Sequence, residues 1–392
     1  MLHHRENRFR DKPHHFPEQF LSQKHDAVSE ESDQPTDDSI TEDAADDTTT
    51  EDAAETPTPT DEETQPATET DVTEESETEQ SDTASATESS DATGALIVSN
   101  EYIFYSSDAE YAAQICGQNG GTLLRWSDGL GVMYCTTTPD GGDVVFYPQE
   151  IYVVESIPYY EQQGDSISNI GATQSLVSNA GSGVVIAVID SGIDLDHPAL
   201  ADSILDAVSV IPSSAYGDDG YFSDLYEGAQ DYAGHGSHIA GIIVGQTDSM
   251  TIGVAPEAQI LSIKALEKYG TSAAGTTEWL IRAIQYAISQ HVDIINLSIG
   301  GSGSYVSAAQ VVLQQAADAG ILVVCATGNT ADAATAGTID YPAAYDSTLA
   351  VSSVTVDGDE VTLSGFSKYG EGTDLSAPGV AIYSCNQNGG YV

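Results

Sequence analysis

Two short stretches of the sequence carry ionisable side chains in settings that could support catalysis. Asp190 directly follows the apolar run VVIAVI, residues 184–189. A carboxylate at the end of a buried strand is partly desolvated and rigidly held, which suits it to orient a base, bind a cofactor or take a structural or metal role. His235 lies in DYAGHGSHIAG, where flanking glycines permit close approach of other backbone. A lone histidine more often has a structural role, so a catalytic role for Asp190 or His235 depends on which other functional residues lie near it.

Two further sites follow apolar runs in the same way. Asn329 ends ILVVCATGN, and its side-chain amide could donate a hydrogen bond into a cleft. The run DIINLSIGG closes with a segment whose free backbone groups could pair with an extended peptide: Ser298, Ile299 and Gly300.

The elements that would position these residues follow from alternating sequence patterns. Apolar runs of strand length recur in the second half of the chain: VVIAVI (184–189), QILSIKAL (259–266), VDIINLSI (292–299), ILVVCA (321–326) and LAVSSVTV (349–356). Between them lie helical stretches such as 277–290, whose apolar residues share one face. The alternation indicates an α/β fold with a mostly parallel sheet covered on both sides. In such sheets functional residues gather at the carboxyl ends of the strands.

Seven strings occur in a fixed order through this part of the chain: VIDSGIDLDHP, GHGSHIAG, GVAPEAQILSIKAL, INLSIGG, VVCATGN, YPAAYD and LSAPGV. Together they resemble the subtilisin family of serine proteases over residues 180–392. The resemblance implies a subtilisin-like three-layer fold. It also implies a serine endopeptidase activity that hydrolyses peptide bonds with an Asp-His-Ser triad.

The resemblance also implies a role for each of the residues singled out. Asp190 would orient and electrostatically support His235, which would be the general base. Asn329 would donate to the oxyanion of the tetrahedral intermediate. One wall of the substrate cleft would be formed by three consecutive residues: Ser298, Ile299 and Gly300.

The nucleophile that this family requires stands in a GTSxAxP string after the APGV segment. Here LSAPGVAIYSCNQNGGYV runs to Val392 without it. We therefore expect a C-terminally incomplete peptidase domain with no nucleophile, and a chain that is inactive as it stands. The string GTSAA (270–274) precedes Asn329, so we expect Ser272 to lie in a cleft loop and to cap the next helix. Ser384 lacks the Gly-Thr that precedes the nucleophile in the GTSxAxP string, so we do not expect it to be the nucleophile either. The alternative is a non-catalytic peptide-binding or surface module on the same scaffold.

Composition and patterning divide the chain into three regions. Residues 1–94 are expected to be disordered and of acidic low complexity from about 26, with 25 Asp+Glu and no Lys or Arg between Asp26 and Asp91. Residues 95–160 are expected to form a small α+β domain whose helix begins at Ser107-Asp108 and stops at Gly120-Gly121. Residues 161–392 would be the peptidase domain.

The small α+β domain precedes the peptidase domain, and in the subtilisin family this is the position of a propeptide. It would be a propeptide-like partner that lies in the cleft, with processing around residues 160–165, and an unrelated small domain is the alternative. Polypeptides in extended conformation would be the substrates. The family implies a secreted or cell-surface protein, although the start, MLHHRENRFRDKPHHFPEQF, lacks the apolar core of a signal peptide.

The charge of the chain disfavours other classes of function. It has 10 Lys+Arg against 62 Asp+Glu and a formal net charge of −52, so it would repel nucleic-acid backbones. No run of about 18 apolar residues is present, so we expect no membrane span.

We expect no cofactor and assign no metal site; a structural calcium stays open as an alternative for which the sequence offers no clear site. His235 and His238 are separated by one helical turn, which fits a single ion poorly, and HxxH lacks the Glu of a zinc-protease helix. Many subtilisins hold a structural calcium with an Asp after the His-Pro of LDHPAL, but Ala199 stands at that position. Cys325, inside an apolar run, is expected to be a buried free thiol, while pairing of the four cysteines stays open.

Overall fold

The computed structural model describes residues 88–90, 96–140, 142, 144–154, 169–170, 172, 179–215, 228–247, 253–301, 307–330 and 336–392. All of them belong to one compact unit. The predicted disordered region lies outside the described residues except for β1 (Glu88–Ser90), which pairs antiparallel with β2 (Leu96–Tyr105). The expected processing point at 160–165 also lies outside the described residues.

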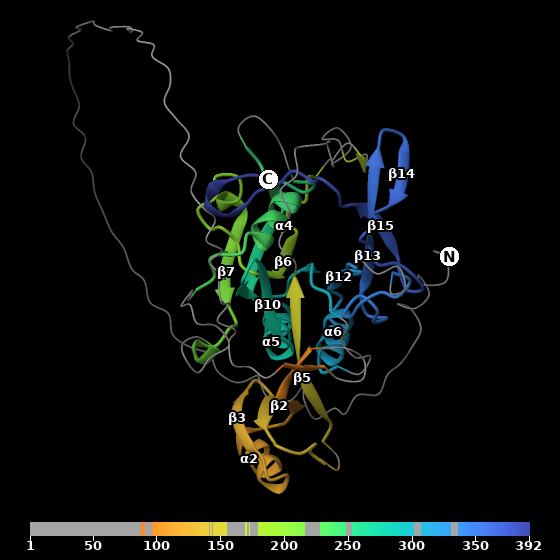
Figure 1. Cartoon of the computed structure of the whole chain (residues 1–392). Helices are drawn as coiled ribbons and strands as arrows, with labels where there is room; N and C mark the ends of the chain where they lie inside the picture. Colours follow the sequence, from red (N-terminus) through yellow and green to blue (C-terminus); the bar gives the residue numbers. More distant parts are fainter. Residues whose placement is uncertain are drawn as a thin grey trace, which may run out of the picture. The chain divides into compact units, whose positions relative to one another are not determined.

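The larger sheet has the strand order β14-β13-β12-β11-β6-β8-β7, with β15 paired to β13 (Figure 1). Its strands are β6 (Val185–Asp190), β7 (Ile204–Ser209), β8 (Gln259–Lys264), β11 (Ile294–Leu297), β12 (Leu322–Ala326), β13 (Leu349–Asp357), β14 (Glu360–Leu363) and β15 (Leu375–Pro378). Each predicted apolar run forms one of these strands. Every pairing is parallel except β13 with β14, which confirms the mostly parallel sheet.

Helices cover both faces of this sheet, as successive residues of β6 show. Ala187 and Ile189 pack in one core cluster with residues of α5 (Thr277–Ser289) and α6 (Ala309–Asp318). The alternate residues Ile186 and Val188 pack in a second cluster with residues of α4 (His235–Val244). A strand's side chains point alternately to opposite faces, so both sets are buried and the run reads as continuously apolar.

The described residues between Leu96 and Val154 contain β2, α2 (Ala109–Gln118), β3 (Thr122–Ser127), β4 (Leu130–Tyr134) and β5 (Phe146–Val154). Asp108 caps α2, because its carboxylate accepts a hydrogen bond from the backbone N–H of Tyr111 at 2.7 Å. Residues 122–134 form a hairpin of β3 and β4. Asp128 and Gly129 take positive φ angles of 49° and 82° and form the two-residue turn between β3 and β4.

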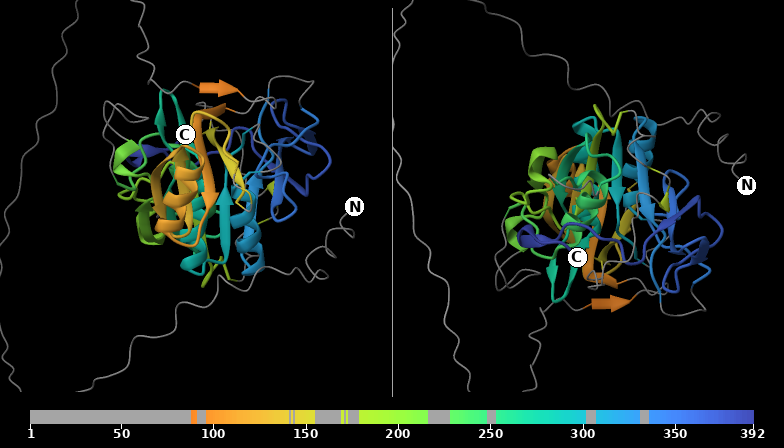
Figure 2. Two further views of the ribbon diagram at one scale, coloured as in Figure 1. Left: turned by 90° about the horizontal axis from the view of Figure 1, so that it is seen from below. Right: turned by 90° about the horizontal axis from the view of Figure 1, so that it is seen from above.

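The sheet of this unit continues into the peptidase part of the chain. Its order is β3-β4-β2-β5-β10-β9, where β10 spans Ser272–Thr276 and β9 spans Glu267–Tyr269. β5 pairs antiparallel with β10, and Figure 2 shows yellow β5 beside these teal strands. The loop and capping role expected for Ser272 is therefore wrong: Ser272 begins a strand, and the cap of α5 is Thr276, whose side chain accepts from Trp279 N.

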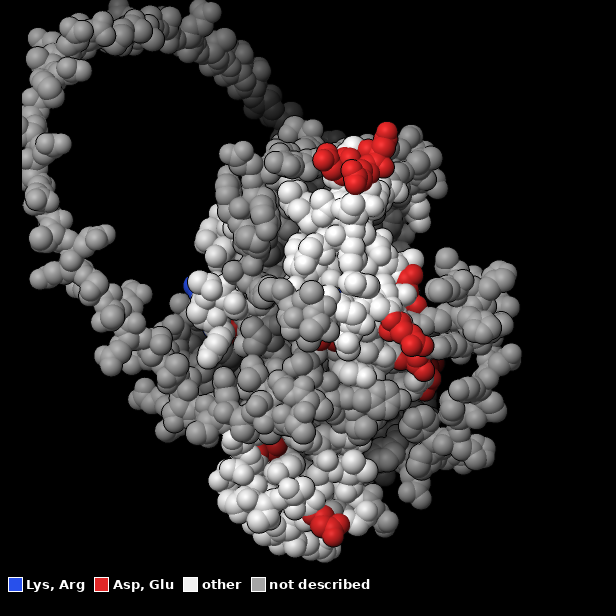
Figure 3. Space-filling view, turned by 45° about the vertical axis from the view of Figure 1, so that its right-hand side comes forward, with Lys and Arg blue, Asp and Glu red and all other residues white. Residues whose placement is uncertain are grey.

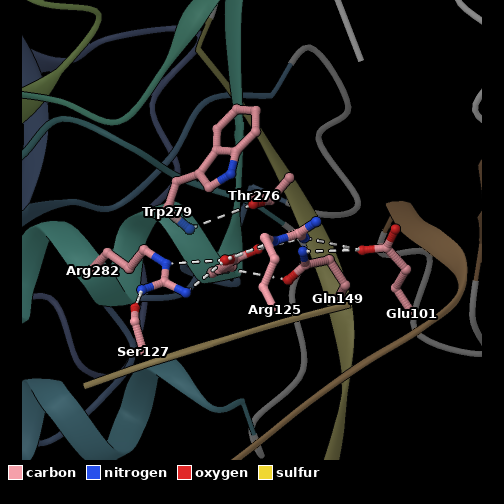
Figure 4. A network of polar contacts seen from close by, with 8 residues as sticks. Glu101, Arg125, Ser127, Gln149, Thr276, Trp279 and Arg282 are labelled. Carbon is pink, nitrogen blue, oxygen red and sulfur yellow. Dashed lines mark hydrogen bonds and ion pairs between the residues drawn. The ribbon is translucent and has the colours of Figure 1, made fainter. Parts of the chain in front are cut away.

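A cluster of ion pairs joins β3 to the first turn of α5 (Figure 4). The fully buried carboxylate of Glu278 accepts from Arg125 Nη2 at 2.7 Å and from Arg282 Nε at 3.0 Å. The side chain of Gln149 accepts from the backbone N–H of Glu278 at 3.3 Å. Burial alone would raise the pKa of Glu278, but the hydrogen bonds and charges of the two arginines outweigh it and leave this pKa below its ordinary value.

The described surface carries the acidic bias of the sequence. Figure 3 shows Asp and Glu at several places on one face and almost no Lys or Arg among the described residues there. Within the described part of the chain, no helix has the length and apolar character needed to cross a bilayer. All four cysteines are buried free thiols, as expected for Cys325.

Candidate active site

Asp190 is the last residue of β6, at the carboxyl edge of the parallel sheet. Its side chain is fully buried, and Oδ1 accepts from the backbone N–H of Ser191 at 2.7 Å. On the neighbouring strand β8 the residue in register with Asp190 is Lys264, itself fully buried. The carboxylate is therefore held by rigid elements, as its position after a buried strand predicts.

His235 is the first residue of α4 and faces Asp190. Its Nδ1 lies 2.8 Å from Oδ1 and 3.0 Å from Oδ2 of the carboxylate. A carboxylate accepts hydrogen bonds, so Nδ1 carries the proton and Nε2 has a lone pair available in the neutral imidazole. The side chain of His235 remains 14% exposed. Nε2 can therefore act as a proton acceptor for a group that approaches from solvent.

The electrostatic surroundings make this imidazole more basic than usual. Burial by itself lowers the pKa of His235, but the charge and hydrogen bond of Asp190 and the charge of Asp231 outweigh burial. The net effect is a pKa above the ordinary value of 6.5. The pair thus has the arrangement of an orienting carboxylate and a base.

Backbone contacts between two glycine-containing loops fix the approach of Asp190 and His235. A Cβ on Gly236 would lie 2.0 Å from the carbonyl oxygen of Gly192. A Cβ on Gly192, at φ +98°, would lie 2.4 Å from the carbonyl oxygen of Ala229. Only glycine lets these segments pack backbone to backbone, which explains the glycines at positions 192 and 236.

His238 lies one turn further along α4 and takes no part in the pair. Its Nε2 donates to the backbone carbonyl of Ile382 at 3.1 Å. Burial lowers the pKa of His238 to about 4, so it is neutral near pH 7. In the described part of the chain, no three His, Cys, Asp or Glu side chains are grouped so that they could hold a metal ion. Ala199 offers no side-chain oxygen, and we assign no calcium site to its loop.

Asn329 and residues 298–300 lie at the same edge of the sheet as Asp190. They follow β12 and β11, and the strand order β12-β11-β6 brings the three carboxyl ends side by side. Asn329 is exposed and forms an isolated bridge with Ser367. Ser298 is half-buried and Ile299 is 1% exposed, while Gly300 packs against the backbone of Gly328. No hydrogen bond among the described residues joins Asn329 to the Asp190–His235 pair.

The two serines considered above as nucleophiles are not hydrogen-bonded to His235. Ser272 lies in β10, and the fully buried Ser384 donates to the backbone carbonyl of His238 at 2.7 Å. In the described ranges, no hydroxyl is hydrogen-bonded to Nε2 of His235.

Two charged groups beside the pair were not singled out from the sequence. Asp231, four residues before His235, is 2% exposed and accepts hydrogen bonds from both loops. Lys264 donates to the backbone carbonyl of Gln230 at 3.0 Å and pairs with Glu267 at 3.0 Å. Asp231 stands inside the quoted string DYAGHGSHIAG, so its proximity to His235 in the chain was the available signal.

The chain is an α/β protein with a hydrogen-bonded Asp190–His235 pair at the carboxyl edge of its sheet. The model of the Subtilase family matches residues 181–391, and the chain belongs to that family. It is 36% identical over 255 residues to Subtilisin E of Bacillus subtilis (strain 168), covering 63% of this chain and 60% of that protein.

Two other relatives match over a shorter segment. Subtilisin of Bacillus pumilus is 38% identical over 213 residues, 54% of this chain and 70% of that protein. The Major intracellular serine protease of Bacillus subtilis (strain 168) is 39% identical over 213 residues, 54% of this chain and 62% of that protein. The matched part of the chain spans about 60% of the length of Subtilisin E and of similar subtilisins.

Proposed function

We propose that this chain is part of a serine endopeptidase in which Asp190 and His235 are two members of an Asp-His-Ser triad. The 2.8 Å contact between Nδ1 of His235 and Asp190 is the observation that carries the proposal. Asp190 holds the imidazole in the tautomer that leaves Nε2 unprotonated, and it stabilises the imidazolium that forms. His235 takes the proton of the nucleophile and returns it to the leaving amine.

The substrate is a polypeptide in extended conformation. Asn329 donates its side-chain amide to the oxyanion that develops on the attacked carbonyl. The segment Ser298, Ile299 and Gly300 forms one wall of the cleft and pairs with the substrate backbone. The exposure of Asn329 and the position of both segments at the edge that carries Asp190 support these roles.

A polypeptide of these 392 residues is inactive, because the serine-bearing GTSxAxP string is not among them. The base and its carboxylate are then present without a hydroxyl to deprotonate, and loss of the serine alone costs roughly a factor of a million in turnover in the subtilisin case known in detail.

Residues 95–160 act as a propeptide that lies in the cleft, so the protein is a zymogen. It is secreted or held at the cell surface, as the resemblance to the subtilisin family implies. Pairing of β5 with β10 supports this role, because it adds the N-terminal unit to a strand of the peptidase part. The buried contact of Arg125 with Glu278 supports it further. Processing falls around residues 160–165 and does not occur in this chain.

The test is a peptide-hydrolysis assay on two purified proteins. One is the 392-residue chain, for which we expect no turnover. The other is a chimera in which Val392 is followed by a serine-bearing GTSxAxP segment of a subtilase, for which we expect turnover sensitive to a serine-protease inhibitor. Asp190→Asn and His235→Gln versions of the chimera are the controls and should lose it. A folded chimera without turnover would favour a peptide-binding module instead.

A further inference from the structure

Asp231 is the most highly connected buried carboxylate beside the proposed catalytic pair. It lies in the segment immediately before α4, and it is 2% exposed. Asp231 precedes α4, whose N-cap residue is Gly234. Glycine has no side chain that could accept hydrogen bonds from the free N–H groups of the first turn. These donors need another acceptor.

Five hydrogen bonds converge on this one side chain. Oδ1 accepts from Ala233 N, Gly234 N and Ser191 Oγ, each at 2.9 Å. Oδ2 accepts from Ser237 N at 2.9 Å and from Ser237 Oγ at 2.6 Å. The carboxylate therefore accepts from one N–H of the first turn of α4 and from two N–H groups just before it, and it also accepts from Ser191 of the segment after β6.

The two serines extend this link from Asp231 to both members of the pair. The hydroxyl of Ser191, the residue after Asp190, accepts from Gly236 N at 3.0 Å. The hydroxyl of Ser237 accepts from Asp194 N at 2.9 Å. The Ser191 hydroxyl thus ties the segment after β6 to both Asp231 and α4, and the Ser237 hydroxyl ties Asp231 to Asp194 of the segment after β6. The relative position of that segment and the start of α4 therefore depends on the carboxylate of Asp231.

We propose that Asp231 is a positioning residue for the Asp190–His235 pair: it fixes the loop that carries Asp190 against the helix turn that carries His235, and it adds a second negative charge beside the imidazole. This inference rests on the proposed function and deepens it. Asp231 touches neither substrate nor reacting atoms, so it acts only through His235 and its partner.

The charges around His235 are those of two carboxylates and a buried cation. Asp190 faces it from β6 and Asp231 from the preceding loop, and both raise the pKa of His235 after burial lowers it. His238 on α4 is neutral near pH 7, since burial lowers its pKa to about 4. Lys264 on β8 is already paired with Glu267. Removing the charge of Asp231 should therefore make His235 easier to deprotonate.

The test is a pH titration of the His235 ring by NMR in the full 392-residue chain, with the resonance assigned from His235→Gln. We expect the midpoint of Asp231→Asn to fall below that of the unsubstituted chain, because the charge of Asp231 favours the protonated ring. The matched control is Asp108→Asn, which removes the carboxylate charge at the cap of another helix, α2, and should leave the midpoint unchanged.

A second variant keeps the proposal testable if Asp231→Asn does not fold. Ser191→Ala retains the charge of Asp231 but removes one bridge, so we expect a smaller fall in the midpoint and faster hydrogen exchange at Gly236 N–H. A midpoint that neither variant moves, or that Asp108→Asn moves equally, would show that Asp231 is only a helix cap. The titration needs no turnover, so this outcome is distinct from an inactive chimera.

Discussion

Replacement of Arg125 by Met tests whether the N-terminal unit is held by its buried ion pair. Arg125 Nε lies 3.1 Å from both carboxylate oxygens of Glu278, and Nη2 lies 2.7 Å from Oε2. Met keeps the apolar stem and removes the charge. Loss of one partner from a buried pair costs about 3–5 kcal/mol when the remaining charge is uncompensated. Since Arg282 still pairs with Glu278 at 2.9 Å, we expect a loss of about 2 kcal/mol in the free energy of unfolding.

Urea unfolding followed by tryptophan fluorescence measures this loss, because Trp126 lies in β3 and Trp279 in α5, the two elements that the ion pair joins. The matched control is Arg125→Met in a Glu278→Gln background, where the carboxylate is already absent and we expect a loss below about 1 kcal/mol. A loss within about 0.5 kcal/mol for the single variant would mean that the pair behaves like a surface salt bridge, and the reasoning from burial would be refuted.

Three further predictions concern the packing and charge of the described residues. Gly236→Ala should lower the free energy of unfolding by about 3 kcal/mol, because its Cβ would lie 2.0 Å from the oxygen of Gly192; a urea midpoint near that of the unsubstituted chain would contradict this. Thr276→Ala should cost about 1 kcal/mol by removing the cap of α5, whereas Ser272→Ala should cost less than about 0.5; equal losses would exclude the capping assignment. Because the pKa of Glu278 is lowered in the folded chain, its stabilising contribution is complete above its ordinary pKa of 4.5 and is lost as the pH falls through the folded value. The stability difference between the unsubstituted chain and Glu278→Gln should therefore shrink in acid, and a constant difference would argue against this.

The central strands of the fold could be predicted because they are buried on both faces. VVIAVI and ILVVCA are continuously apolar and VDIINLSI largely so, and short apolar runs between helices are typical of a covered parallel sheet. β14 could not be predicted in this way, because all four of its residues are exposed. β10, with the sequence SAAGT, carries little strand signal and forms a strand by pairing with β5, more than a hundred residues earlier in the chain.

Only those residues of the candidate site that have a local sequence pattern around them could be predicted. Asp190 and His235 each stand beside a recognisable pattern, a buried strand in one case and flanking glycines in the other. Asp231 has no such pattern, because its importance comes from donors in two separate segments that only the fold brings together. The hairpin turn at Asp128-Gly129 did have a local signal, since Asp-Gly favours a two-residue turn with positive φ.

The central claim, that His235 is the general base of a serine endopeptidase, is tested most directly by the pH dependence of kcat/KM in the serine-bearing chimera. The acid limb of that profile reports the pKa of the essential base in the free enzyme. We predict that the pKa given by the acid limb is higher than 6.5 and equals the pKa of His235 measured by NMR in the same protein. An acid limb that differs from the NMR value, or that persists in His235→Gln, would contradict the claim.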